Sequence, residues 1–388
     1  MTAVQFIISS AFSIIPPVIP LLLPAMGVHE PGAVRLWAGA LLGVTPLSAA
    51  LMSPWWGRLS DRIDRRLIIL ISCAAVALCT ALMSLVSHPT PLLALRFGMG
   101  LFGGHVAAGM ALISAVTPVS RLGYALGWMA TAQLAGSLLG PVIGGGLADT
   151  FGNLRAPFFG ASVATVLVAG AIALVPSQAR SSGTRPAVAS AEVPVARPKH
   201  GELAPLIVVL LLVQCAIMSP QPIVSLRVLE LEGPRRELAT LAGFAFSVVA
   251  LAGLIGAPVL GRLADQMGAR QVLLWSALAA ALCTVPQAFA PDYVWFVAER
   301  FLGGLFLAGI IPTVNALIGK SVAEADRGRT YGITASAAFL GAFLGPVGGG
   351  ALAAQFGLPS VFLGSGFLLL AAAVWIAARV TPSSSSNR

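Results

Sequence analysis

The charged residues of this 388-residue chain concentrate in one short stretch, residues 57–66, which reads GRLSDRIDRR and carries six charges in ten positions. A weaker copy at residues 261–270 reads GRLADQMGAR, and the aspartates Asp61 and Asp265 of the two copies lie 204 positions apart. Both stretches lie between long apolar runs. The chemistry open to them is reversible charge pairing, because a carboxylate can bind the positive N-terminal end of a helix and release it again.

The two charged stretches allow two interpretations. Their arginines fit a topogenic loop, which keeps positive charge on one side of a membrane. That interpretation does not account for the fixed spacing of glycine, aspartate and basic residues, or for the second copy. We therefore expect a conformational latch, in which Asp61 faces the N-terminal end of the apolar run 329–353. The residues assigned to this latch are Gly57, Asp61, Arg62, Arg65, Arg66, Gly261 and Asp265.

Two arginines lie inside apolar runs and are also 204 positions apart, Arg96 in LRFGMGLF and Arg300 in ERFLGGLF. A charge in hydrocarbon is costly. Each arginine can extend its side chain to the membrane surface, hold an anionic group of a substrate, or modulate a proton site. Five further residues are assigned to a proton or substrate pathway: His105, Gln133, Gln214, Glu299 and Asn315. Their structural alternatives are packing, a hydrogen bond between helices or, for Glu299, an ion pair with an arginine.

Glycines recur at every fourth position of one apolar run. Gly136, Gly140 and Gly144 share a helix face, with Pro141 and Gly145 beside them, and a later run repeats the pattern at an offset of 205. Small residues at this spacing let helices approach closely, and a proline inside a helix bends it. The pattern predicts a close-packed, kinked seam between two halves of the molecule.

The composition indicates a membrane protein with many spans. The chain is 57% hydrophobic and 10% charged, whereas soluble domains carry about 25% charged residues. Its mean hydropathy is +0.91. The net charge of +9 does not indicate nucleic-acid binding, because the lysines and arginines lie between apolar runs. The four cysteines show no metal-type spacing, and no phosphate-binding loop or zinc motif is present in the sequence. Energy for any transport must then come from an ion gradient or from the gradient of the substrate.

The apolar runs predict twelve membrane spans, each of about 20 to 25 residues. They cover residues 4–26, 36–56, 67–87, 92–117, 122–148, 156–176, 203–226, 238–260, 271–290, 293–318, 329–353 and 358–379. No basic region precedes the first run, so we expect it to be retained and not cleaved as a signal peptide. The predicted domains are two six-helix bundles, 1–176 and 203–380. Residues 177–202, rich in Ser, Ala and Pro, are expected to form a linker, and 381–388 a disordered tail.

Positive charge is distributed unevenly over the predicted loops. Sixteen of the 23 lysines and arginines lie on the side that holds both termini, and five lie on the opposite side. Positively charged loops stay in the cytoplasm. The sequence therefore predicts an inner or plasma membrane protein with cytoplasmic termini, linker and charged stretches.

These motifs together resemble the major facilitator superfamily, and within it the twelve-span drug:proton antiporter branch. Residues 57–66 resemble the motif that the superfamily carries between spans two and three, and residues 136–145 are similar to the antiporter motif of span five. The resemblance covers essentially the whole chain and is closest to bacterial multidrug and tetracycline-type exporters. It implies an all-α membrane protein with the major facilitator fold, in which two pseudo-symmetric six-helix bundles enclose a central cavity.

The resemblance also implies a function. The chain would be a secondary active transporter and not an enzyme, exporting small amphipathic compounds in exchange for protons by alternating access, with antibiotic resistance as the outcome. It would need a proton gradient in place of a cofactor or metal, and would act as a monomer in the lipid bilayer without a nucleic-acid partner. A metabolite or sugar uniporter or symporter is the alternative within the superfamily. A polytopic receptor would need a sensory domain, for which the sequence has no candidate.

The sequence departs from the family pattern at three points. Asp64 stands where the motif has a glycine, and we expect it to adopt a left-handed backbone, which aspartate tolerates better than most residues. Met99 replaces the glutamine that follows the span-four arginine. No acidic residue lies in the first span, so the proton carrier must be sought elsewhere in the chain.

Overall fold

The computed structural model describes residues 2–60, 63–103, 109, 113, 117–174, 200–321 and 327–380. Within these ranges the regular elements are helices, and no strand occurs. The α-helices are α1 (Thr2–Leu22), α2 (Pro31–Ser60), α3 (Arg65–Leu85), α4 (Pro89–Leu101), α6 (Val119–Thr150), α7 (Ala156–Leu174), α8 (His200–Met218), α9 (Gln221–Glu232), α10 (Leu238–Met267), α11 (Ala269–Thr284), α12 (Tyr293–Leu307), α13 (Ile310–Ser321), α14 (Arg327–Phe356) and α15 (Pro359–Arg379). Two short 3-10 helices are η1 (Pro24–Met26) and η2 (Pro286–Phe289). The predicted all-α architecture is confirmed.

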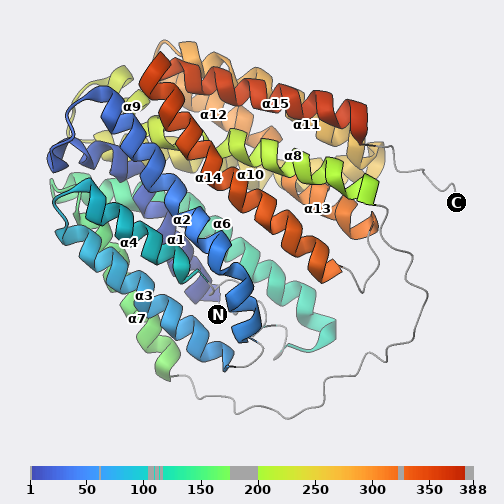
Figure 1. The fold of residues 1–388 in the computed structure, drawn as a ribbon, viewed down its shortest axis with the longest axis horizontal. Helices are drawn as coiled ribbons and strands as arrows, with labels where there is room; N and C mark the ends of the chain where they lie inside the picture. The colour runs from blue at the N-terminus through green and yellow to red at the C-terminus, as the bar shows by residue number, and fades with distance from the viewer. Residues whose placement is uncertain are drawn as a thin grey trace, which may run out of the picture.

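The helices form two sets that lie side by side, α1 to α7 and α8 to α15, which we call the two halves (Figure 1). Each half has a hydrophobic core of its own. In the N-terminal half Ile19 of α1 and Phe158 of α7 belong to one buried cluster. In the C-terminal half Val213 of α8 and Ile376 of α15 belong to another. The buried residues of each hydrophobic cluster therefore come from one half.

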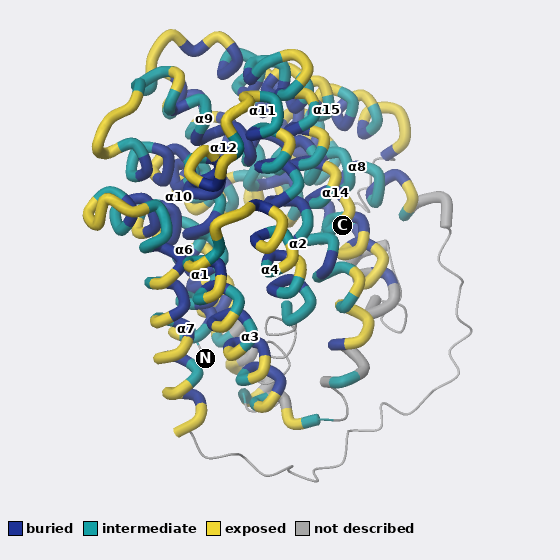
Figure 2. The backbone as a smooth tube through the Cα atoms, turned by 60° about the vertical axis from the view of Figure 1, so that its left-hand side comes forward, coloured by how far each residue is buried: buried dark blue, intermediate teal, exposed yellow. Residues whose placement is uncertain are grey.

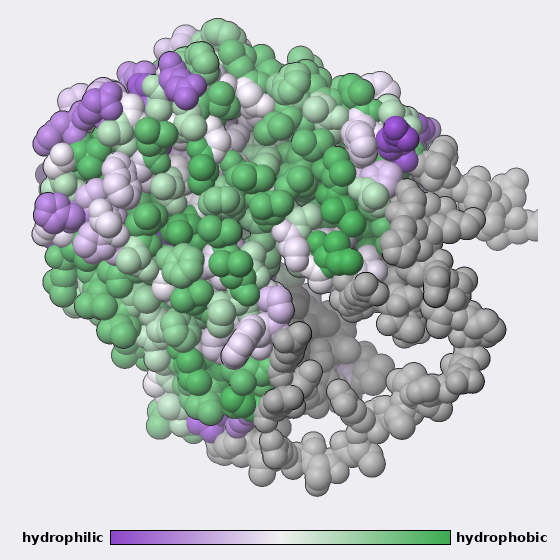
Figure 3. Space-filling model, viewed as in Figure 1, coloured by the Kyte–Doolittle hydropathy of each residue, from purple (hydrophilic) through white to green (hydrophobic). Residues whose placement is uncertain are grey.

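The outer surface of the helices is apolar, as a lipid-facing surface must be. Among the described residues, ten helical segments are long and apolar enough to cross a membrane. Apolar side chains cover the middle of the face in Figure 3, and hydrophilic ones gather at its ends. The predicted span 92–117 is not among the ten, because it runs into residues outside the described part. The predicted span 122–148 is α6, whose seven glycines lower its hydropathy.

The two charged stretches are more helical than the sequence suggested. In the first, α2 continues to Ser60 and α3 begins at Arg65. In the second, α10 continues to Met267 and α11 begins at Ala269, so the connection is Gly268 alone. The expected left-handed backbone at Asp64 is wrong. Its φ is −57°, and its side chain caps α3 by accepting a hydrogen bond from the backbone N–H of Arg66. Gly268, 204 positions later, takes the positive φ of 93°, which a glycine adopts without strain.

Two predicted spans are interrupted helices. The run 203–226 consists of α8 and α9, which separate at Ser219 and Pro220, where the proline cannot donate a backbone hydrogen bond. The run 293–318 consists of α12 and α13, which separate at Ala308 and Gly309. A Cβ added at Gly309 would lie 2.5 Å from the Cβ of Leu260 on α10. This break therefore occurs where a neighbouring helix approaches closely.

The helices have two ends that differ in how close the halves lie. We call the end where α7 finishes at Leu174 and α8 begins at His200 the linker end. The opposite end, where α6 finishes at Thr150 and α10 begins at Leu238, is the far end. In both backbone views the linker ends of α7 and α14 lie well apart (Figures 1 and 2).

Candidate functional site

The halves meet at the far end, where α6 and α10 approach each other to backbone contact. A Cβ added to Gly145 would lie 2.1 Å from the carbonyl oxygen of Ala239, and one added to Gly243 would lie 2.1 Å from that of Pro141. Real Cβ atoms essentially never come within 3.0 Å of another heavy atom. Only glycine fits at these two points, which we call the α6–α10 seam.

A second seam joins α2 and α14 in the same way. A Cβ added to Gly39 would lie 2.5 Å from the carbonyl oxygen of Pro346, and one added to Gly350 would lie 2.6 Å from that of Arg35. Each of these four residues matches its counterpart in the first seam at an offset of 204 or 205 positions. The repeat seen in the sequence is therefore also a repeat of contacts between the halves.

The helices of these seams lose contact toward the linker end. A Cβ added to Gly127 of α6, Gly261 of α10 or Gly332 of α14 would meet no heavy atom within 4 Å. Trp55, near the linker end of α2, is 66% exposed. The seams thus hold the halves together at the far end, whereas the linker ends of α2 and α14 lie apart (Figure 1).

Three of the α6 glycines that the sequence predicts to lie between the halves instead face a helix of their own half. A Cβ added to any of the three glycines on one face of α6 would lie within 2.9 Å of a carbonyl oxygen of α1, a helix of the same half. These glycines are Gly136, Gly140 and Gly144. The prediction is wrong for them, because the spacing shows that a helix approaches but not which helix. Pro141 and Gly145 of the same motif do lie at the α6–α10 seam.

Arg96 and Arg300 are bound to the backbone of a neighbouring helix in their own half. The Nε of Arg96 donates to the carbonyl oxygen of Leu41 at 2.6 Å, and the Nε of Arg300 donates to that of Ala245 at 2.7 Å. Leu41 and Ala245 are again 204 positions apart. Arg96 is 5% exposed, so it does not extend to the membrane surface. The guanidinium of Arg300 also lies over the ring of Phe296, 5.7 Å from its centroid. These bonds clamp α4 to α2 and α12 to α10.

Glu299 is a buried carboxylate with an incomplete set of partners. It is 8% exposed, and its Oε1 accepts a hydrogen bond of 2.8 Å from the indole Nε1 of Trp295, one turn earlier in α12. Its Oε2 has no hydrogen-bond partner among the described residues. The neighbouring Arg300 is committed to Ala245, and in the described part of the chain no ion pair involves Glu299. A carboxylate held in this way is suited to binding a proton.

The latch predicted at the charged stretches falls partly outside the described residues, which exclude Asp61, Arg62 and the side chain of Arg65. Gly57 lies in α2. Arg66 donates from Nη2 to the carbonyl oxygen of Ala173, at the end of α7. In the second stretch Asp265 is exposed, and a Cβ added at Gly261 would meet only open space. The latch stays a prediction.

The uncharged polar residues of the predicted pathway remain apart. His105 lies outside the described residues. Gln133 is exposed on α6, Gln214 is half-buried on α8, and Asn315 is half-buried on α13. Across the described ranges, no hydrogen bond joins one of these three side chains to another. Their role in a pathway stays a prediction as well.

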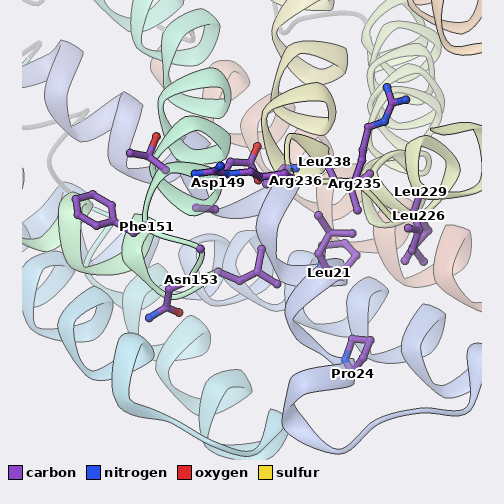
Figure 4. A pocket seen from close by; sticks show the side chains of 16 residues that line it. Leu21, Pro24, Asp149, Phe151, Asn153, Leu226, Leu229, Arg235, Arg236 and Leu238 are labelled. Atoms are coloured by element: carbon purple, nitrogen blue, oxygen red, sulfur yellow. Dashed lines mark hydrogen bonds between the residues drawn. The ribbon is translucent and has the colours of Figure 1, made fainter. Parts of the chain in front are cut away.

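A pocket of about 590 Å³ opens at the far end between the halves (Figure 4). The N-terminal half contributes Pro24, Asp149 and Asn153, and the C-terminal half contributes Arg235 and Arg236. None of these residues belongs to a motif with fixed spacing, so the sequence patterns do not indicate the pocket. It borders the α6–α10 seam, because Ala239 is also in its wall.

Comparison with known sequences places these features in a family. The chain matches the family model of the Major Facilitator Superfamily over residues 1–234 and 234–388. It is 32% identical over 358 residues to the multidrug resistance protein MdtG of Dickeya zeae (strain Ech586), covering 92% of this chain and 88% of that protein. It is 33% identical over 384 residues to the uncharacterised MFS-type transporter YuxJ of Bacillus subtilis (strain 168), covering 97% of each.

Solved structures share the fold at low sequence identity. A bacterial homologue of the human lysosomal transporter Spinster, in an inward-facing and occupied conformation, matches with a TM-score of 0.80 and 15% identity over 99% of this chain and 97% of that one. The nucleoside transporter NupG matches with a TM-score of 0.75 and 12% identity over 97% and 98% of the two chains. At these identities the likeness concerns the arrangement of helices.

Proposed function

Since the chain belongs to the major facilitator superfamily, and is thus a multi-pass membrane transporter and not an enzyme, we propose that it exports small amphipathic compounds in exchange for protons. The observation that carries this proposal is the pair of glycine seams, which close the halves at one end only. Such a molecule can alternate access by rocking one half against the other. The relative MdtG is named as a multidrug resistance protein, which supports amphipathic drugs as the substrate class.

The seams also suggest which state the structure represents. The predicted topology places the linker end in the cytoplasm and the far end outside. With the far end closed and the linker end spread, the chain would be in an inward-facing state, ready to take up substrate from the cytoplasm or the inner leaflet. Its resemblance to a transporter solved in an inward-facing conformation supports this assignment. Asp61, with the other residues of the predicted latch, would close the linker end in the second half of the cycle.

We propose Glu299 as the proton carrier. It is the only aspartate or glutamate within the twelve predicted spans, and its Oε2 has no partner among the described residues. A neutral glutamic acid can be buried at lower cost than a carboxylate. Proton binding would therefore lower the free-energy cost of burying Glu299, and proton release would raise it again, within each transport cycle.

Everted membrane vesicles test the function directly. After a preformed pH gradient is established, the addition of a cationic amphipathic drug should collapse part of the gradient, because each drug molecule carried into the vesicle releases protons. Vesicles from cells that lack the chain are the control. If no drug of a broad panel moves protons while a sugar or other metabolite is carried, the chain is the metabolite carrier of the same superfamily.

The Asp61→Asn variant tests the latch proposed for the linker end. It should transport slowly while its amount in the membrane stays normal.

A further inference from the structure

The N-terminus of α10 is capped by a residue of the other half. The carboxylate of Asp149, at the end of α6, accepts hydrogen bonds from the backbone N–H of Ala239 (N to Oδ1, 3.2 Å) and of Thr240 (N to Oδ2, 2.7 Å). Glu237, the N-cap residue of α10, makes no cap bond with its own side chain. The first amides of a helix need an acceptor and carry partial positive charge, and a carboxylate meets both needs. The cap therefore ties the start of α10 to the other half.

The α2–α14 seam carries the converse arrangement. Arg35 of α2 donates from Nη1 to the carbonyl oxygen of Ala353, in the last turn of α14, at 2.9 Å. A cation is favourable there, because the last carbonyls of a helix carry partial negative charge. Arg35 and Ala239 are 204 positions apart. At equivalent places, one seam thus has a carboxylate bound to the start of a helix, and the other has a guanidinium bound to the end of a helix.

We propose that Asp149 and Arg35 are positioning residues that latch the far end, and that both bonds must break for the far end to open. This inference rests on the proposed alternating access. The glycines set how close the helices come, whereas the two latches supply charge-assisted bonds that exist only while the far end is closed. Asp149 also lines the far-end pocket, so water can replace the amides of α10 as its partners on opening. Loss of a latch shifts the population toward the far-open state.

The test is a distance measurement between the far ends of the two halves. Thr90 of α4 and Val294 of α12 are exposed equivalents, 204 positions apart, near the far end. Spin labels at Thr90→Cys and Val294→Cys, in an active background with the four native cysteines replaced by alanine, report the separation by electron–electron double resonance. The measured variants are Asp149→Ala and Arg35→Ala. Glu237→Ala removes an exposed charge from the same end that makes no cap bond and does not line the pocket, and serves as the control.

The latches predict a longer-distance population in both variants and an unchanged distribution in the Glu237→Ala control. The ratio of far-open to far-closed molecules should rise by about tenfold in Asp149→Ala. Asp149→Asn, which keeps one acceptor oxygen, should lie between the wild type and Asp149→Ala. If folded, monodisperse Asp149→Ala and Arg35→Ala give the wild-type distribution, the latches are overturned. No substrate is needed, so this result stands apart from any failure to find a transported drug.

Discussion

Arg66 and Arg270, 204 positions apart, make the same bond in the two halves. The Nη2 of Arg66 donates to the carbonyl oxygen of Ala173 at 2.7 Å, and the Nη2 of Arg270 donates to that of Ala377 at 2.7 Å. The two acceptors are themselves 204 positions apart. Each arginine ends a charged stretch and is the second residue of the helix that follows it, α3 or α11. Each binds the C-terminal end of the last helix of its half, where a cation is favourable. The basic end of the charged stretch therefore has a structural role within one half.

Replacing either arginine should lower stability without changing the seams. In Arg66→Ala or Arg270→Ala a charged hydrogen bond at a partly exposed helix end is lost, which costs about 1 kcal/mol. The thermal midpoint of the detergent-solubilised protein should fall by roughly 2–4 °C. Arg262→Ala, in the exposed part of the second stretch, should leave the midpoint unchanged. If all three variants have the thermal midpoint of the wild type, these two bonds do not contribute to stability.

Gly145 and its neighbour Gly146 provide a matched pair for the α6–α10 seam. A Cβ at position 145 would lie 2.1 Å from the carbonyl oxygen of Ala239, whereas one at position 146 would meet nothing within 4 Å. Gly145→Ala should therefore prevent full closure of the far end and reduce transport by an order of magnitude or more, about 1.4 kcal/mol or above. Gly146→Ala should transport at the wild-type rate. Rates are compared in vesicles after normalisation to the protein in the membrane, and equal rates would exclude a close seam at this point.

Glu299→Gln should separate drug binding from proton movement. Glutamine can still accept the hydrogen bond from Trp295 but cannot take up and release a proton. The variant should bind drug with an affinity within about threefold of wild type and should no longer collapse the pH gradient when drug is added. Glu237→Gln, an exposed acid at the far end, should behave like wild type. Drug-induced proton movement that persists in Glu299→Gln would place the carrier elsewhere.

The sequence alone predicts the fold and its repeat well, because both depend on apolar run length and on residue identity at a constant offset. It predicts that Arg96 and Arg300 are equivalent, and the structure gives them equivalent partners. Those partners are backbone carbonyls, which every residue has, so no sequence pattern can reveal them. The same reason hides the acceptor of Arg35 and the amides that Asp149 caps.

The identity of neighbouring helices was the harder part of the prediction. Gly136 and Gly145 belong to one motif, yet Gly136 faces α1 in its own half and Gly145 faces α10 in the other. Nine residues of α-helix turn through two and a half turns, so the two glycines lie on different faces. A spacing rule identifies a face that allows close approach, but the partner depends on the packing of the whole bundle.

A cross-link at the far end tests alternating access most directly. Thr150 is the last residue of α6 and Thr240 lies in the first turn of α10, so the two residues are on opposite sides of the α6–α10 seam. Cysteines at these positions can be joined by a short cleavable cross-linker. Cross-linked protein in proteoliposomes should not transport, and cleavage of the linker should restore the rate. A control link between Thr150 and Pro24, both from the N-terminal half and both in the wall of the far-end pocket, should leave transport unchanged. Full transport with the α6–α10 link in place would show that the far end does not open during transport.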